Sequence, residues 1–340
     1  MSAGTRAARS PEDSTEHNAE GTAEHLAGPS AAHGPADGPT AAQDARAGSG
    51  EARPEAGDVF LTWLYVPGDR PDVVAKALRS GADVVLVDLE DAVAPARKEY
   101  ARAATAELLA GPVPGPARVH VRVNALDGPF LTADLAALAG LPGLGGLRLP
   151  KVTGPGDVAS VLERYADLAG TDAAVPGLYP LLESALGLEN AFAIATASPA
   201  VRGIALGEAD LRADLGVAGE DALGWPRVRT VVAARAAGLA PPAQSVYPDV
   251  RDLEGLDASC RRGRDLGFVG RTAIHPRQLP VIARAYLPTP EQVEAARETV
   301  DAAAASPGAL ALPDGRFVDP AVVAGARRVL ALAARAQARP

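Results

Sequence analysis

The chain has 340 residues, 47% of them hydrophobic, and its 33 basic and 42 acidic side chains give a formal charge of −9, which together predict an acidic globular protein. No block of lysines and arginines suits a phosphate backbone and no apolar run reaches about 18 residues, so we expect no nucleic-acid partner and no membrane association. The single cysteine, Cys260, excludes an internal disulfide framework, and the N-terminus lacks the apolar stretch of a secretory signal, so a cytoplasmic location is predicted.

The first segment, residues 1–57, is predicted to be a disordered tail. It contains no Val, Ile, Phe, Tyr or Trp, and Leu26 is its only large aliphatic residue beyond Met1. Such a composition cannot bury enough apolar surface to offset the entropy lost on ordering.

Short aliphatic runs alternate with stretches of helical period along residues 58–287. The predicted strands are 59–66, 83–89, 117–123, 146–150, 178–183, 203–207, 244–247 and 272–275, and the predicted helices are 71–80, 96–110, 131–139, 155–168, 185–197, 226–237, 253–266 and 276–285. This alternation indicates an α/β protein with a parallel sheet, and eight units favour a closed (β/α)₈ TIM barrel over an open sheet. Residues 288–340 are then surplus and predict a C-terminal helical extension, with helices at 289–306 and 320–334.

Polar side chains follow several of these apolar runs, at the edge of a parallel barrel where enzymes carry their chemistry. They are Asp88, Glu90 and Asp91 after the second run, Arg122 in the third, Lys151 after the fourth, Glu183 at the end of the fifth and Asp210 after the sixth. Glu183 and Asp210 fall on neighbouring strand ends, where two carboxylates can share one Mg²⁺ completed by water and substrate oxygens. Arg122 would then hold or polarise an anionic substrate. Each residue alone also suits a helix cap or a surface ion pair, so this pattern indicates a metal-assisted barrel enzyme and no more.

Several short motifs occur in order between about residues 59 and 334. They are Val66-Pro67-Gly68-Asp69-Arg70-Pro71, Asp88-Leu89-Glu90-Asp91, Val121-Arg122-Val123-Asn124, Leu149-Pro150-Lys151, Leu182-Glu183-Ser184-Ala185, Gly207-Glu208-Ala209-Asp210 and Ala273-Ile274-His275-Pro276. Together they closely resemble the citrate lyase β-subunit-like family, in the HpcH/HpaI aldolase superfamily of CoA-ester lyases.

The resemblance implies a TIM barrel assembled as a trimer or hexamer, with Mg²⁺ held by Glu183 and Asp210 and with Arg122 binding the substrate. The resemblance also implies that backbone N–H groups around Gly207, Glu208 and Ala209 bind the substrate carboxylate. Successive N–H groups of this kind can form a nest for an anion.

Other charged residues have expected roles around that site. Glu90 and Asp91 are expected to support the metal through water or hydrogen bonds. Relatives often carry Arg-Ser before the first strand's Val-Pro-Gly, where it helps to fix CoA, but this chain has Leu61-Thr62-Trp63 there. Contacts to the CoA phosphates are therefore expected from Arg70 and Lys151. We interpret His275 as a buried structural residue.

The C-terminal extension resembles that of the malyl-CoA and citramalyl-CoA lyase branch, in which a hairpin carrying an Asp, followed by a helix, reaches a neighbouring subunit's active site. Residues 313–320 fit this shape, because an Asp-Gly pair suits the turn and Asp319 precedes Pro320 at a helix start. Asp319 is thus a candidate acid/base, although a helix-capping role alone would also explain it.

The activity implied by the resemblance is reversible Claisen-type cleavage of a β-hydroxyacyl-CoA, such as malyl-CoA, citramalyl-CoA or citryl-CoA. The products are an acyl-CoA and a 2-oxo acid, with Mg²⁺ as the Lewis acid and Asp319 as the base in the condensation direction. Two alternatives stay open. One is an aldolase acting on free hydroxy-oxo acids, and the other is the β subunit of a multi-subunit citrate lyase or a non-catalytic binding subunit.

Overall fold

The computed structural model describes residues 59–170, 174–305, 310–311 and 315–337 of the chain. The predicted tail, residues 1–57, lies outside this described part, so its disorder stays a prediction. None of the described helices is both long and apolar enough to cross a membrane.

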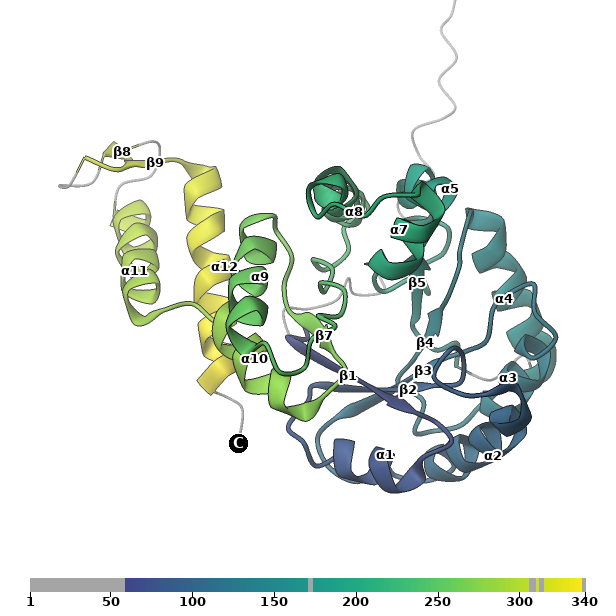
Figure 1. Cartoon of the computed structure of the whole chain (residues 1–340). Coiled ribbons are helices and arrows are strands. Elements are labelled where there is room, and N and C mark those ends of the chain that lie inside the picture. The colour runs from purple at the N-terminus through teal and green to yellow at the C-terminus, as the bar shows by residue number, and fades with distance from the viewer. Residues whose placement is uncertain (1–58, 171–173, 306–309, 312–314, 338–340) are drawn as a thin grey trace, which may run out of the picture. The chain divides into compact units, whose positions relative to one another are not determined.

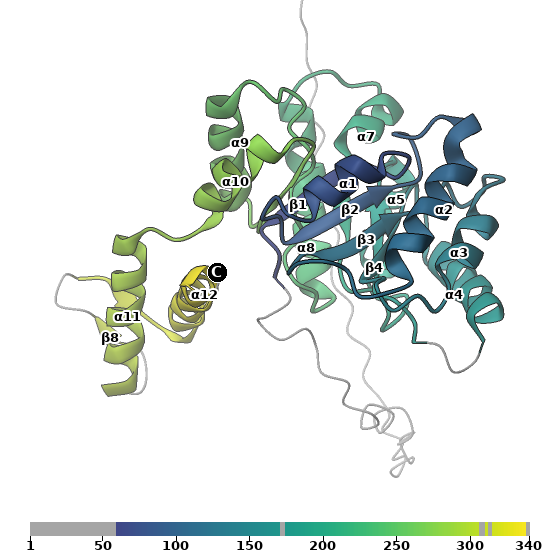
Figure 2. The same cartoon turned by 90° about the horizontal axis from the view of Figure 1, so that it is seen from below.

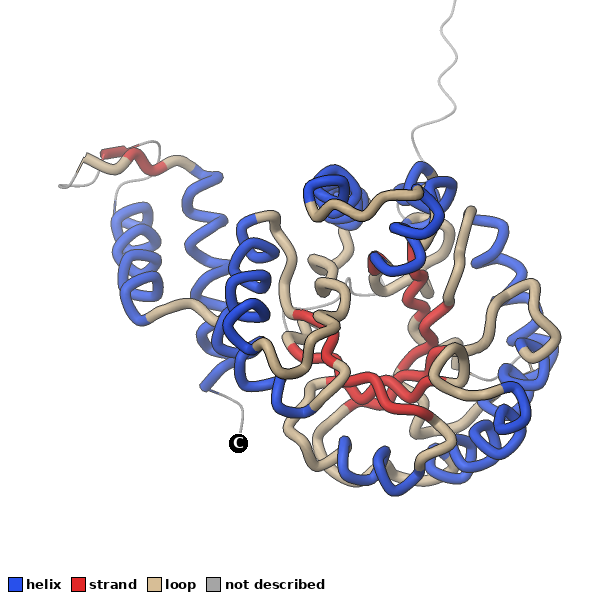
Figure 3. Tube along the Cα trace, viewed as in Figure 1, coloured by secondary structure: helices blue, strands red, loops and turns tan. Residues whose placement is uncertain are grey.

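Seven parallel strands form one curved sheet in the order β6-β5-β4-β3-β2-β1-β7. Their bounds are β1 Thr62–Pro67, β2 Val84–Asp88, β3 Arg118–Arg122, β4 Gly146–Leu149, β5 Leu178–Leu182, β6 Ala205–Leu206 and β7 Arg271–Ala273. In Figure 3 the strands follow a curved path and most of the helices lie outside it. The predicted parallel α/β architecture is therefore confirmed.

The predicted closure into eight strands is not confirmed. The expected strand at 244–247 is reduced to one parallel bridge, between Gln244 and Arg271, and the other end of the sheet is the two-residue strand β6. Prolines surround this segment, at Pro241, Pro242 and Pro248. Because proline has no N–H to donate to a ladder, these prolines limit any strand here to the residues between them, 243–247.

Helices connect the strands and cover the outside of the sheet (Figure 1). Their bounds are α1 Pro71–Ala77, α2 Lys98–Leu109, α3 Leu131–Leu138, α4 Pro155–Ala169, α5 Ala185–Glu189, α6 Ala191–Ala195, α7 Glu208–Leu215, α8 Gly224–Ala236, α9 Leu253–Asp265 and α10 Leu279–Tyr286. The helix predicted over 185–197 is two short helices that meet at Asn190, and α7 was not predicted.

Two longer helices, α11 Pro290–Ala305 and α12 Pro320–Gln337, confirm the helices predicted in the C-terminal extension. They pack against each other, as Figure 2 also shows. Between them, β8 Leu310–Ala311 pairs antiparallel with β9 Phe317–Val318. Part of the predicted hairpin, residues 312–314, lies outside the described residues, and the proposed domain boundaries stay predictions.

Side chains alternate between the two faces of each strand. In β2, Val85 and Val87 belong to the aliphatic layer between sheet and helices, whereas Val84 and Leu86 pack on the concave side with Phe60 and Trp63. Asp88 has the same parity as Val84 and Leu86, so it ends β2 on the concave side. The same alternation carries polar side chains of β3 and β5 to that side.

Candidate active site

The predicted site residues follow parallel strands at their carboxyl ends. Asp88 and Arg122 are the last residues of β2 and β3, Glu183 directly follows β5, and Gly207 directly follows β6. Ser184 fixes where β5 ends, because its Oγ accepts the N–H of Gly187 at 3.1 Å and caps α5. These side chains are therefore gathered at one edge of the sheet.

Arg122 and Asp88 form a two-pronged ion pair. The Nε and Nη2 of Arg122 donate to the two carboxylate oxygens of Asp88 at 2.8 and 2.6 Å, and Nη1 lies 2.8 Å from Oε2 of Glu90. Burial acts to lower the pKa of Arg122, but the hydrogen bonds and charge of Asp88 outweigh it and raise that pKa. Arg122 is therefore a permanent cation, with most of its donors already engaged.

The loop after β2 is held from both sides. Asp88 accepts the backbone N–H groups of Glu90 and Ala92 at 2.9 and 3.1 Å. The buried Nζ of Lys98 donates to the carbonyl oxygens of Leu89 and Glu90 at 2.7 and 2.6 Å. Sequence reasoning missed Lys98, and a lysine at the start of a helix gives no distinctive signal of burial.

Lys151 adopts a left-handed backbone conformation, with φ 54°, and is the only non-glycine residue with positive φ in the described part of the chain. This conformation is uncommon away from glycine and is found at functional sites. Its N–H donates to Oε2 of Glu183 at 2.8 Å, and its Nζ forms an ion pair with Glu90. Lys151 therefore joins Glu90 to Glu183, and its ammonium group is engaged by a carboxylate.

Glu183 is almost fully buried and stands directly against Gly207. A Cβ at position 207 would lie 2.4 Å from Cγ and 2.5 Å from Oε1 of Glu183, so the carboxylate fills the space that any side chain there would need. Burial raises the pKa of Glu183 to about 7, the N–H of Lys151 acts against this rise, and the negative charge of Asp210 adds to it.

Asp210 lies in the first turn of α7, exposed, and makes no hydrogen bond or ion pair with another described residue. Its charge reaches Glu183, so the two carboxylates predicted to share a metal repel each other in this arrangement. A divalent cation between them would relieve that repulsion, and the donor set of two carboxylates with space for water suits Mg²⁺. No group of three or more His, Cys, Asp or Glu side chains placed to hold a metal occurs among the described residues.

Glu208 and Ala209 begin α7, where the first backbone N–H groups have no acceptor within the helix. The side chain of Glu208 has a different role. It forms a two-pronged ion pair with Arg227 of α8, at 2.8 and 2.7 Å. This pair ties α7 to α8. The backbone N–H of Glu208 lies 3.4 Å from Oγ of Ser245, and that of Gly207 donates to the carbonyl oxygen of Leu182 at 3.0 Å, so Ala209 keeps the freest of the three predicted N–H groups.

Three other predicted residues lie outside this cluster or at its margin. Asp91 is mostly exposed, with its carboxylate 3.6 Å from Nη1 of Arg122. Arg70 is exposed on the loop after β1 and pairs with Asp72 at 3.5 Å. Asp319 caps α12, accepting the N–H of Val322 at 2.8 Å, and makes no hydrogen bond or ion pair with the other predicted site residues that the structure describes.

His275 corrects the interpretation of a buried structural residue. Its side chain is exposed, because it stands at the start of a 3₁₀ turn, Pro276–Gln278, that leaves the sheet. Its Nδ1 accepts the N–H of Arg277 at 3.1 Å, so its role is that of a helix cap. The prediction that His275 has a structural role is therefore kept, and the prediction that it is buried was wrong.

A buried cation on the concave side was also missed. Arg148 of β4 is 3% exposed, and its guanidinium lies 4.8 Å from the ring of Trp63 and 5.8 Å from that of Tyr179. Burial lowers its pKa. His120, fully buried 5.2 Å from Trp63, has a pKa well below 6.5 because burial disfavours its charged form. Strand alternation was the available signal, since Arg148 lies between Leu147 and Leu149.

Known proteins are similar to this chain in sequence and fold. Residues 61–276 match the family model described as HpcH/HpaI aldolase/citrate lyase. The chain is 36% identical over 286 residues to a (3S)-malyl-CoA thioesterase of Cereibacter sphaeroides, covering 81% of this chain and 94% of that protein. It is 34% identical over 287 residues to citrate lyase subunit beta of Leuconostoc mesenteroides, covering 80% and 92%. The crystal structure of CitE from Mycobacterium tuberculosis with magnesium, acetoacetate and coenzyme A aligns with a TM-score of 0.69 and 33% identity, covering 82% of this chain and 99% of that one.

Proposed function

The chain belongs to the HpcH/HpaI aldolase/citrate lyase family, as its motifs predicted, and on that premise we propose that it is a Mg²⁺-dependent carbon–carbon lyase acting on a β-hydroxyacyl-CoA. The reaction cleaves a thioester of the malyl-, citramalyl- or citryl-CoA type into an acyl-CoA and a 2-oxo acid. The related CitE crystallised with magnesium, acetoacetate and coenzyme A supports both the metal and the class of substrate.

One observation supports the proposal more than any other. The buried carboxylate of Glu183 lies against Gly207, close enough to the carboxylate of Asp210 to be repelled by its negative charge. These two residues would hold Mg²⁺, with water and substrate oxygens completing its ligands. Bound Mg²⁺ supplies Lewis-acid polarisation of the carbonyl group of the 2-oxo acid.

The neighbouring residues orient the substrate. Arg122 keeps its positive charge and would stabilise the oxygen on which negative charge develops. The N–H groups at the start of α7 would receive the substrate carboxylate, as anions are received at helix N-termini. Of the two residues predicted for CoA phosphates, exposed Arg70 suits that task better, because its pair with Asp72 is open to solvent whereas the ammonium group of Lys151 is held by the buried Glu90.

The test is the incubation of purified protein with malyl-CoA, citramalyl-CoA or citryl-CoA, with and without Mg²⁺. We expect an acyl-CoA and a 2-oxo acid in equal amounts, formed only with Mg²⁺. Release of free CoA with the intact hydroxy acid would instead show hydrolysis, the activity named for the Cereibacter relative. Cleavage of free hydroxy-oxo acids alone, or activity only with added carrier and transferase proteins, would favour the two alternative functions.

Mg²⁺ affinity is expected to fall as the pH drops below about 7. Burial raises the pKa of Glu183 to about 7, so below that pH the carboxyl group is protonated and must lose its proton before it can bind a cation. Calorimetry in two buffers of different ionisation enthalpy should detect about one proton released at pH 6 and almost none at pH 8.5. Equal affinity at both values would remove Glu183 from the metal site.

We also propose that the chain forms a homo-oligomer through an apolar patch on α8 and α6. Trp225, Val228 and Val232 lie on one face of α8, 57%, 40% and 53% exposed, and α8 packs against α6, where Phe192 is also exposed. Exposed apolar patches of this kind mark interfaces, and self-association is the commonest way to cover one. A cytoplasmic location stays a prediction, supported by the free thiol of buried Cys260.

Trp225→Glu is expected to lower the oligomeric mass measured by light scattering after gel filtration, because it places a charge in the patch. The control Trp225→Phe keeps an apolar ring and should leave the mass unchanged. An unchanged mass for the glutamate variant would place the interface elsewhere.

Asp319 is proposed to act in the site of a neighbouring subunit, where its carboxylate removes the proton alpha to the thioester in the condensation direction. Asp319→Asn should lower turnover about 100-fold and leave Mg²⁺ affinity unchanged. Asp301→Asn, an exposed position on α11, is the matched control. Mixing subunits of Asp319→Asn with subunits of Glu183→Gln should restore part of the activity, and failure of such mixed oligomers would contradict a shared site.

A further inference from the structure

A cavity lies away from the candidate active site. It has a volume of about 850 Å³ and is bounded by segments that precede strands, among them Val59 before β1 and Val269 before β7, together with α12. The predicted site residues instead follow their strands. The cavity is therefore at the opposite end of the sheet from Glu183, and its volume is in the range of small-molecule sites.

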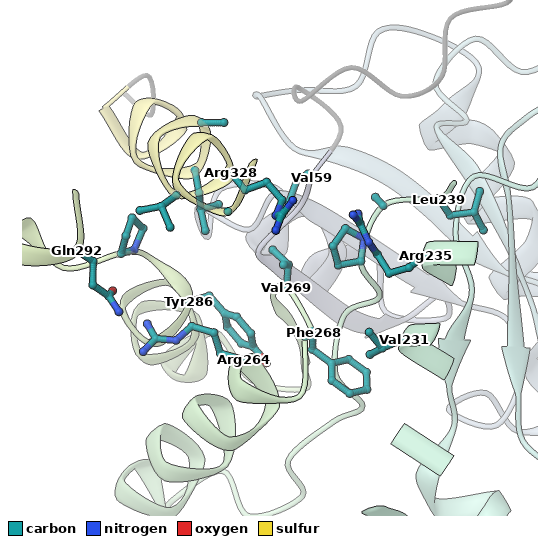
Figure 4. A pocket seen from close by; sticks show the side chains of 18 of the residues that line it. Val59, Val231, Arg235, Leu239, Arg264, Phe268, Val269, Tyr286, Gln292 and Arg328 are labelled. Atoms are coloured by element: carbon teal, nitrogen blue, oxygen red, sulfur yellow. The ribbon is translucent and has the colours of Figure 1, made fainter. Parts of the chain in front are cut away.

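The walls of this cavity are mainly apolar. Phe268, Tyr286 and Leu239 line one side of it (Figure 4). Leu332 and Val329 of α12 also belong to the lining. A wall of this kind accepts an alkyl chain, since each buried CH₂ group contributes about 0.8 kcal/mol. The charged residues of the lining then determine which polar head group suits the cavity.

Three arginines and no carboxylate line the cavity. This lining is positively charged, whereas the whole chain has a formal charge of −9. Arg264 donates to the carbonyl oxygen of Ala285 at 3.1 Å. Arg235 and Arg328 make no hydrogen bond or ion pair with any described residue, and Figure 4 shows their side chains on either side of Val59. Two guanidinium groups without a protein carboxylate therefore stand beside an apolar lining, an arrangement complementary to an anion with an apolar chain.

We propose that this cavity binds an amphipathic carboxylate, a medium- or long-chain fatty acid anion. The carboxylate is held by Arg235 and Arg328, because guanidinium groups match carboxylate geometry with two parallel hydrogen bonds. The alkyl chain lies against Phe268 and Leu332. Because the lining comes from the segments before β1 and β7 and from α12, such a ligand contacts both at once.

The experiment measures binding of radiolabelled laurate to the full chain by equilibrium dialysis. We expect saturable binding of one laurate per chain, at least about tenfold weaker in the double variant Arg235→Gln/Arg328→Gln. Both arginines are exposed, so this variant should fold normally. Arg229→Gln/Arg327→Gln is the matched control, since it removes two arginines of α8 and α12 that do not line the cavity, and it should bind as the parent does.

Two further ligands decide between recognition of the anion and plain apolar adsorption. Dodecyltrimethylammonium has the same chain with the opposite charge and should bind at least about tenfold more weakly than laurate. Butyrate has the carboxylate without the chain and should not compete. The proposal is overturned if laurate does not bind, if the two double variants bind it equally, or if dodecyltrimethylammonium binds as tightly as laurate.

Discussion

Glu183→Gln is expected to abolish Mg²⁺-dependent turnover and leave the fold intact. The substitution keeps the shape of the side chain and an oxygen that can accept the N–H of Lys151, but removes the negative charge that a divalent cation needs. The loss of metal binding should exceed about 100-fold, the upper end of what removing a partner around a metal ligand costs.

The thermal stability of the Glu183→Gln variant should not fall with its activity. Burial and the charge of Asp210 both disfavour the ionised form of Glu183 at neutral pH, so a neutral amide removes an unfavourable charge from the metal-free protein. Thermal unfolding should therefore occur at the same temperature as in the parent protein or higher. Glu189→Gln, the same change at an exposed position of α5, is the control. Unchanged Mg²⁺ affinity in the Glu183 variant would contradict the proposed site.

Arg122→Met is expected to lower both activity and stability. Arg122 balances the buried carboxylates of Asp88 and Glu90, and without it two charges remain buried without their main cation. Breaking a buried ion pair on one side costs about 3 to 5 kcal/mol. Calorimetric unfolding and turnover, measured on the same preparation, check both effects.

Two comparisons separate the structural loss from the catalytic one. Arg102 forms a similarly enclosed pair with Asp134 at 2.9 Å, so Arg102→Met should lose stability and keep its turnover at a temperature where it is folded. Arg122→Met/Asp88→Asn removes charges of both signs and should regain part of the stability without regaining activity. If the double variant regained activity, Arg122 would have only a structural role.

The parallel sheet was predictable because short apolar runs, such as residues 84–87, alternate with stretches of helical period. Closure was not predictable in the same way. The segment around Gln244 has Val246 and Tyr247 as its apolar residues, and prolines on both sides limit its length to a single bridge to Arg271. Helix α7 escaped prediction because half of its eight residues are charged and only Leu211 is buried.

Individual site residues were predictable as residue types at strand ends, and their partners were not. Glu208 illustrates the difference: its place after β6 follows from the motif, but its side chain is paired with Arg227, 19 residues further along. The left-handed backbone of Lys151 is likewise set by the turn between β4 and α4, where its N–H reaches Glu183. Long-range contacts of this kind depend on how the helices pack, which local pattern does not specify.

The two tryptophans of the chain occupy contrasting surroundings. Trp63 is 6% exposed among the rings of the concave side, and Trp225 is 57% exposed on the patch of α8. Indole fluorescence shifts to shorter wavelengths as its surroundings become less polar. The emission spectrum therefore contains two reporters, a short-wavelength component that is lost when the sheet opens and a long-wavelength component that shifts only when α8 is covered.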